Sequence, residues 1–173
     1  MVAGWARVSV KEVNLALTHA TEMKQNQTTG GCQCGALRYE FQGAPRAAEI
    51  CHCRMCQKAF GNWGAAFIEV PLANFNWTKE KPATFHSSAR VARGFCAKCG
   101  TPLSMYEAGE DFIDLAAGTL DDPSGITFTR QIGIESRLPW FKTLHQLPEF
   151  ETSATRSAED LIRLASRQFP DKD

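Results

Sequence analysis

Seven cysteines are the residues of this chain whose type and spacing most clearly predict chemistry. They occur in three tight groups, Cys32-x-Cys34, Cys51-x-Cys53-x-x-Cys56 and Cys96-x-x-Cys99. Short cysteine pairs that lie far apart in sequence typically build tetrahedral thiolate sites, and zinc is the usual metal. Divided as four plus three, the thiolates would complete one site and leave a free position at the other. The sequence therefore predicts two Zn²⁺ ions per chain, one of them open to substrate.

The first predicted site combines Cys32 and Cys34 with Cys96 and Cys99. Glycines flank both pairs and permit the tight backbone turns that let each pair converge on one ion. A closed shell of four thiolates leaves no room for a substrate, so we interpret this site as structural. It would contribute directly to folding, because its ligands come from distant parts of the chain.

The second predicted site has three thiolates, from Cys51, Cys53 and Cys56, and needs a fourth ligand from elsewhere. The candidates are water, a substrate thiol, and the histidines His52, His86 and His145. Strand alternation points His52 away from the face that Cys51 and Cys53 share. Capped by water or histidine, the site would be inert; left open, it would bind a thiol.

A thiol bound to zinc has a lowered pKa and is held as a thiolate, which could add to a small aldehyde. Arg54 and Lys58 could offset the negative charge of this site or contact the carboxylates of a thiol substrate. Phe60, Trp63 and Phe67 could wall a pocket over the metal, although aromatic residues beside a strand are more often part of the core.

Composition and charge narrow the class of protein. At 173 residues the chain fits one domain, and its 19 Lys and Arg balance its 19 Asp and Glu, which disfavours nucleic acid as a partner. No run approaches the ~20 apolar residues that span a bilayer, and the first residues lack a secretory signal. The odd number of closely spaced cysteines fits a reducing compartment. We expect a cytoplasmic protein with no membrane partner.

From Gly31 onward the pattern indicates short strands separated by turns. Alternation puts Leu37, Tyr39 and Phe41 on one face of a strand. The predicted strands are 36–41, 65–70, 75–77, 83–86, 102–106, 112–117 and 127–134. One helix is expected near the C-terminus, where Ser157 can cap an apolar segment.

The N-terminal residues differ in composition from the rest. Ser9 and Glu12 could form a capping box for a short helix, and 25–30 has the composition of a polar linker. Residues 1–22 could be a dispensable extension, with Met23 as the natural start.

The motifs around the cysteines resemble those of the glutathione-dependent formaldehyde-activating enzymes (GFA), a family grouped with the centromere protein V type domain. The resemblance covers about 31–150. It rests on Gly31-Cys32-x-Cys34-Gly35, Cys51-His52-Cys53-x-x-Cys56, Ser87-Ser88, Arg93-Gly94-Phe95-Cys96-x-x-Cys99-Gly100-Thr101, Gly118 to Pro123 and Ser136 to Trp140. It implies a mainly β, Mss4-like fold that contains a zinc ribbon, with a structural zinc on four cysteines and a catalytic zinc on three.

For the family's named enzyme, the resemblance implies a carbon-sulfur lyase reaction written in reverse, in which glutathione and formaldehyde form S-(hydroxymethyl)glutathione. We therefore expect a small thiol and a small aldehyde as partners, and pairing of the chain as a homodimer stays open. The expected organisation is an N-terminal extension or linker at 1–29, a GFA-like zinc-binding domain at 30–150 and a helical tail at 151–173.

Two other functions would use the same residues. In one, both zinc ions only shape a surface for a protein partner, and the module is not catalytic. In the other, a related zinc fold reduces peptide methionine sulfoxide. That reaction lacks a spare nucleophilic cysteine when all seven bind metal.

Overall fold

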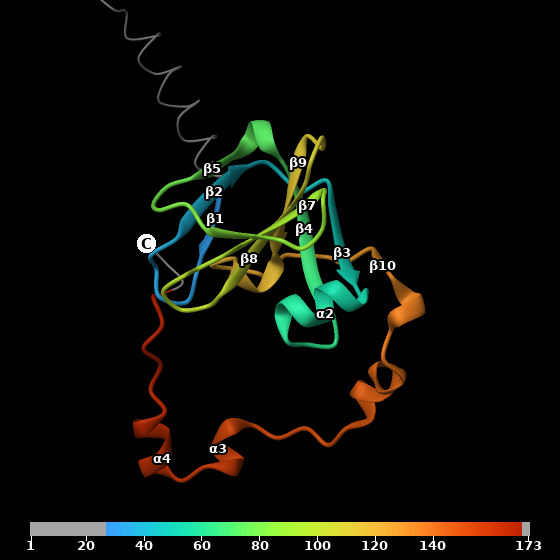
Figure 1. Ribbon diagram of the computed structural model, residues 1–173. Coiled ribbons are helices and arrows are strands. Elements are labelled where there is room, and N and C mark those ends of the chain that lie inside the picture. The colour runs from blue at the N-terminus through green and yellow to red at the C-terminus, as the bar shows by residue number, and fades with distance from the viewer. Residues whose placement is uncertain (1–26, 171–173) are drawn as a thin grey trace, which may run out of the picture.

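The computed structural model describes residues 27–170, which form two β-sheets with short helical elements between and after the strands (Figure 1). The strands are β1 (Gln27–Gly31), β2 (Arg38–Gln42), β3 (Ala47–Cys51), β4 (Ala65–Pro71), β5 (Phe75–Trp77), β6 (Ala83–His86), β7 (Val91–Phe95), β8 (Pro102–Glu107), β9 (Phe112–Ala116) and β10 (Arg130–Ile132). The helical elements are α2 (Arg54–Phe60), η1 (Leu72–Asn74), η2 (Ala117–Thr119), η3 (Ile134–Ser136), η4 (Pro139–Gln146), α3 (Thr152–Thr155) and α4 (Ala158–Arg163). The prediction of a mainly β fold with a short C-terminal helix is confirmed.

The smaller sheet has the order β1-β2-β5, and the larger sheet has the order β10-β3-β4-β9-β8-β7-β6. Neighbouring strands are antiparallel, except that β10 runs parallel to β3. The register aligns Arg93 of β7 with Met105 of β8, then with Asp114 of β9 and Glu69 of β4. Directly paired residues share a face of a sheet, so these four side chains form one row on the larger sheet.

The main core contains side chains from both sheets. Tyr39 and Phe41 of β2 are each 1% exposed and pack in one cluster with Ile68 of β4, as the predicted alternation requires. Phe67 points to the opposite face of β4, where it forms a second cluster with Cys56. The larger sheet therefore buries one face in the core and offers the other face to α2.

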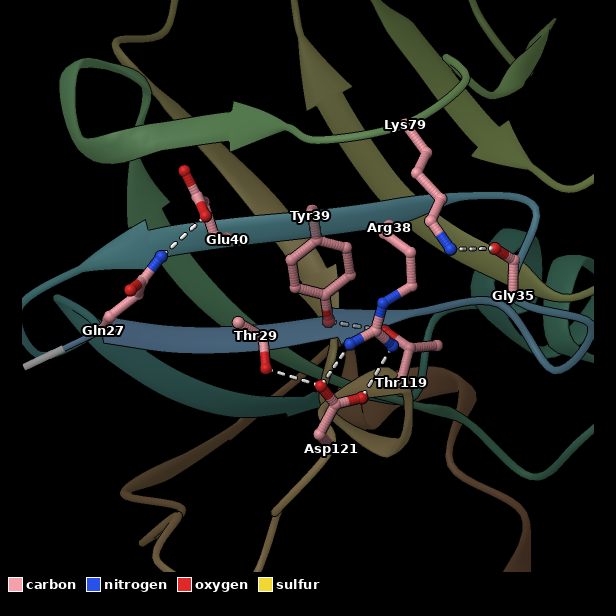
Figure 2. A network of polar contacts seen from close by, with 9 residues as sticks. All are labelled: Gln27, Thr29, Gly35, Arg38, Tyr39, Glu40, Lys79, Thr119 and Asp121. Atoms are coloured by element: carbon pink, nitrogen blue, oxygen red, sulfur yellow. Dashed lines mark hydrogen bonds and ion pairs between the residues drawn. The ribbon is translucent and has the colours of Figure 1, made fainter. Parts of the chain in front are cut away.

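A polar network joins the smaller sheet to the segment that follows β9 (Figure 2). Arg38 of β2 donates two hydrogen bonds to Asp121, of 2.8 and 2.5 Å, and these side chains are only 4% and 12% exposed. Thr29 of β1 also donates to Asp121, at 2.5 Å, and Tyr39 hydrogen-bonds Thr119 at 2.8 Å. The network thus fixes the path of the chain between the two sheets.

Several elements differ from the sequence prediction. Residues 27–30 were expected in a linker but belong to β1, which pairs with β2 along its whole length. Strands β3 and β7 and helix α2 were not predicted, and the strand expected at 127–134 is only Arg130–Ile132. The helix expected near Ser9 lies outside the described residues. Helix α4 is capped as predicted, because Ser157 Oγ accepts a hydrogen bond of 3.1 Å from the backbone N–H of Asp160.

Figure 1 shows the chain after β10 running around the outside of the sheets before it returns toward the β1–β2 end. Among residues 27–170, no helix has both the length and the apolar character needed to cross a bilayer.

Candidate metal centres

The structure brings the first predicted group of cysteines together: Cys32, Cys34, Cys96 and Cys99 have sulfur atoms that all lie within 4.8 Å of one another. The Sγ atoms of Cys32 and Cys34 are 3.5 Å apart, and those of Cys34 and Cys96 are 3.8 Å apart. Four thiolates at the usual Zn–S distance of about 2.3 Å have sulfurs separated by about 3.8 Å. The spacing therefore fits a tetrahedral metal of the size of zinc.

Two tight turns with the same design present these sulfurs. Gly35 donates its backbone N–H to the carbonyl of Cys32 at 2.9 Å, and Gly100 donates to the carbonyl of Cys96 at 2.8 Å. Both glycines have left-handed backbones, with φ of 72° and 78°. A side chain would strain either turn, which explains the glycine that follows each cysteine pair.

The second predicted group also comes together, at the junction of β3 and α2. Cys51 ends β3, Cys53 is the N-cap of α2 and Cys56 lies in its first turn, and their sulfurs lie within 4.8 Å of one another. The backbone N–H of Cys56 donates to Cys53 Sγ at 3.4 Å, so a thiol replaces the usual Ser or Asp cap. Within residues 27–170, no histidine or carboxylate completes this group.

None of the three candidate histidines, all of which lie among residues 27–170, belongs to this group. His52 is fully buried, and its ring nitrogens are not part of the group, in agreement with the alternation argument. Its Nε2 hydrogen-bonds Gln131 at 2.9 Å, and its ring centroid lies 4.6 Å from that of Phe141. His86 and His145, the two more distant candidates, are exposed and lie outside the group.

Arg93 is the cation that contacts the second group, and its role was not predicted from sequence. The side chain is 7% exposed and donates from Nη2 to Cys56 Sγ at 3.5 Å and from Nε to Ser87 Oγ at 3.1 Å. A hydrogen bond from Cys51 and the Arg93 guanidinium together lower the pKa of Cys56, against the opposing effect of burial. In the sequence, Arg93 and Ser87 stand out only as parts of the motifs shared with the family. The contact between Arg93 and Cys56 could not be predicted from them, because it depends on how β7 packs against α2.

A cavity of about 350 Å³ lies between α2 and strands β6 and β7. Its walls include Arg54, Met55, Lys58, Phe85 and Arg93. The two predicted substrate contacts, Arg54 and Lys58, therefore share a cavity wall with Arg93. The guanidinium that donates to Cys56 is that of Arg93, while Arg54 donates to Gln57 Oε1 at 3.0 Å. The roles of Arg54 and Lys58 toward the thiolates or a substrate stay predictions.

The three aromatic residues proposed as pocket walls separate into two roles. Phe60 and Trp63 line a cavity of about 280 Å³. Phe67 is 1% exposed and belongs to the cluster around Cys56, with its ring centroid 5.4 Å from that of Phe60. The alternative interpretation of Phe67 as a core residue is therefore the correct one.

The segment after β10 covers one side of the second group. Gly133 lies so close to Cys53 that a Cβ at this glycine would come within 2.7 Å of the backbone nitrogen of Cys53, and its φ of 62° is left-handed. The backbone N–H of His52 donates to the carbonyl of Ile132 at 2.9 Å, which holds the two segments together. Sequence patterns predicted a strand here but did not connect it with the cysteines.

Comparison with known proteins identifies one matching family. The family model described as "Glutathione-dependent formaldehyde-activating enzyme" matches residues 27–135, a segment that contains all seven cysteines. No curated protein matches the chain significantly. Among solved structures, the crystal structure of a Rhodobacter sphaeroides protein, a target of Northeast Structural Genomics, is 17% identical with a TM-score of 0.47, covering 60% of this chain and 98% of that chain.

Proposed function

Because this chain belongs to the glutathione-dependent formaldehyde-activating enzyme family, we propose that it is a zinc-dependent enzyme of the carbon-sulfur lyase type. In this proposal it binds a thiol such as glutathione at Cys51, Cys53 and Cys56 and adds the thiol to formaldehyde or another small aldehyde. The two cysteine clusters could hold metal ions, and their donors are consistent with zinc.

The division of seven sulfurs into a set of four and a set of three carries this proposal. Four thiolates fill the tetrahedral shell of zinc, whereas three leave room for one more ligand. Cys53 is the partly exposed member of the second set, and Cys51 and Cys56 are buried. An incoming thiol would therefore approach from the side of Cys53.

Zinc held by the three thiolates would supply one property, namely a lowered pKa for a thiol bound beside them. The protein supplies the surroundings. Arg93 donates to Cys56 and so places positive charge beside an electron-rich cluster. Phe60 and Trp63 line a cavity of about 280 Å³. Arg54 and Lys58, which line a separate cavity, are proposed to attract the carboxylates of the thiol.

The proposed reaction is the addition of a thiolate to the carbonyl group of an aldehyde. The substrate sulfur, already without its proton, forms a bond to the carbonyl carbon. The carbon–oxygen double bond becomes a single bond, and the oxygen takes a proton from water. No oxidant or reductant is required, because the product is the adduct of thiol and aldehyde.

Two serine substitutions test whether the two metal centres have different roles. Cys99→Ser removes one donor from the closed site and is expected to abolish folding, because that metal joins distant segments. Cys56→Ser is expected to leave the protein folded and to stop acceleration of the exchange between free and hydroxymethylated glutathione, followed by NMR. Equal loss of folding in both variants, or a wild-type rate equal to that of buffer, would favour a non-catalytic two-zinc module.

A further inference from the structure

The segment that follows α4 contacts the turn between β1 and β2, which presents Cys32 and Cys34. The backbone N–H of Phe169 donates to the carbonyl of Gln33, between these two cysteines, at 2.7 Å. Among residues 161–170, Phe169 is the one side chain that is not exposed. This aromatic residue therefore anchors the C-terminal segment beside the first cysteine group.

One glycine and two cations form the surface on which the Phe169 ring lies. Gly35 is buried, and a Cβ at this position would overlap the Phe169 ring. The guanidinium of Arg38 lies 5.2 Å from the ring centroid and Lys79 Nζ lies 4.8 Å from it, distances at which a cation is attracted to an aromatic face. Lys79 also donates to the carbonyl of Gly35 at 3.3 Å (Figure 2). Gly35, Arg38 and Lys79 thus make a docking site for an aromatic side chain.

A series of hydrogen bonds connects the docked segment to the second turn of the same cysteine group. Gln33, whose carbonyl accepts from Phe169, donates its own backbone N–H to Thr101 Oγ1 at 3.1 Å. Thr101 Oγ1 in turn hydrogen-bonds Cys99 Sγ at 3.1 Å. Phe169 therefore contacts one cysteine turn directly and is linked to the other through Gln33 and Thr101.

The docked segment also borders the space next to the first cysteine group. A cavity of about 430 Å³ has Cys32, Cys99, Gln168 and Phe169 among its lining residues. Cys34, which precedes Gly35, is the exposed member of the group. Loss of a metal from four thiolates requires that a ligand moves away and that a competing ligand enters. The C-terminal segment lies where both events would take place.

We infer that docking of Phe169 controls the loss of metal from the first cysteine group. While the ring is docked, it holds the turn that carries Cys32 and Cys34 and slows the release of zinc; when the ring leaves, the turn opens more often and zinc is released faster. The family match ends at residue 135, so this device belongs to a part of the chain outside the matched segment. It does not depend on thiol chemistry at the second group.

Release of zinc from the zinc-loaded protein to an excess of a chromogenic chelator tests this inference. We expect Phe169→Ala to accelerate one phase of release at least about fivefold, because the ring loses both cations and its packing on Gly35. Hydrogen exchange locates the effect. The N–H of Gly35, which donates to the carbonyl of Cys32, should exchange faster, whereas the N–H of His52 beside the second group should not change.

Three further variants separate docking from a general loss of stability. Phe150→Ala is the matched control, because Phe150 lies in the same C-terminal part of the chain but is 74% exposed, and it should release zinc at the wild-type rate. Phe169→Trp keeps an aromatic face for the two cations and should remain close to wild type. Lys79→Ala removes one of these cations and should also accelerate release, which keeps the test decisive if Phe169→Ala does not fold.

Three results would overturn the inference. The first is a wild-type rate of zinc release in both Phe169→Ala and Lys79→Ala. The second is an equal acceleration by Phe150→Ala, which would show that any change in the C-terminal segment has the same effect. The third is faster exchange at Gly35 and His52 alike, which would show that the whole protein is destabilised. Failure of glutathione to bind at the second group would leave the inference in place.

Discussion

At the scale of single residues, we expect metal binding by Cys51, Cys53 and Cys56 to depend on the close approach of the backbone after β10 to Cys53. Gly133→Ala would place a Cβ within 2.7 Å of the Cys53 backbone nitrogen at a left-handed φ of 62°. We expect this variant to lose the metal at Cys51, Cys53 and Cys56 and to keep the other, measured as zinc per chain. Gly125→Ala is the matched control, because a Cβ there meets nothing within 4 Å. Full zinc content in both variants would contradict this dependence.

Asp114 gives the stability of the protein a specific pH dependence. Burial, followed by the nearby Glu49, Glu69 and Cys56, raises the pKa of this carboxyl from 3.8 to about 7, although Arg130 acts in the opposite direction. At a pH between these two pKa values, Asp114 is protonated in the folded state and ionised in the unfolded state. The stability from this group is therefore present at about pH 4 and lost as the pH rises through 7.

Asp114→Asn removes this titration. Relative to wild type, the variant should gain free energy of unfolding as the pH rises from about 4 to 7, by up to about 4 kcal/mol if the whole pKa shift is realised. Urea denaturation of both zinc-loaded proteins across this range measures the difference. A difference that stays constant with pH would show that Asp114 does not titrate in this way.

The chemistry of single residues could be predicted from the sequence wherever spacing alone determines it. The grouping of Cys51, Cys53 and Cys56 is local, because six consecutive residues contain all three. The contact between Arg93 and Cys56 could not be predicted, because these residues are far apart in the chain and meet only when β7 packs beside α2. The same reason explains why the close approach of Gly133 to Cys53 was missed.

At the scale of elements, two arginine–aspartate pairs of similar geometry should differ in their contribution to stability. The Arg38–Asp121 pair joins β2 to the segment after β9 and is 4% and 12% exposed (Figure 2). The Arg46–Asp111 pair also makes two hydrogen bonds, each of 2.7 Å, but is 43% and 74% exposed. Solvent screens the second pair, whereas breaking the first would leave a buried charge without its partner.

We expect Asp121→Asn to lower the free energy of unfolding by about 3 kcal/mol. Asp111→Asn should change it little, because water replaces the lost partner. Chemical denaturation of the two variants beside wild type provides the comparison. Equal losses would mean that burial of the Arg38–Asp121 pair does not determine its contribution.

The elements that were predicted share clear patterns, and those that were missed do not. Strands β5 and β6 match their predicted bounds, because turn residues bracket short runs with strand-forming side chains. Helix α2 has seven residues and is capped by Cys53, a residue that ordinarily gives no helix start signal. Strand β7 carries Arg93 and Gly94 in its centre, so its pattern is not typical of a strand.

At the scale of the whole molecule, the C-terminal segment contacts the turn that contains Cys32 and Cys34 of the first cluster. The backbone N–H of Phe169 donates to the carbonyl of Gln33 at 2.7 Å. The Phe169 ring lies 5.2 Å from the Arg38 guanidinium and 4.8 Å from Lys79 Nζ. The C-terminal helix was predicted from its cap, but this docking could not be, since it joins the end of the chain to the turn that contains Cys34.

The two clusters together define what the molecule as a whole is expected to do. One closed set of four thiolates would hold the fold, and one set of three would present a metal to a thiol. Removal of both metals with a chelator should therefore unfold the protein and not merely inactivate it, and circular dichroism would follow that loss.

Zinc X-ray absorption on the purified protein, with and without glutathione, tests the central claim most directly. We predict two zinc ions per chain, one bound by four sulfurs and one by three, with a light atom as the fourth ligand of the second. Added glutathione should replace that light atom with a fourth sulfur. A single zinc per chain, or a sulfur coordination that glutathione leaves unchanged, would contradict the account.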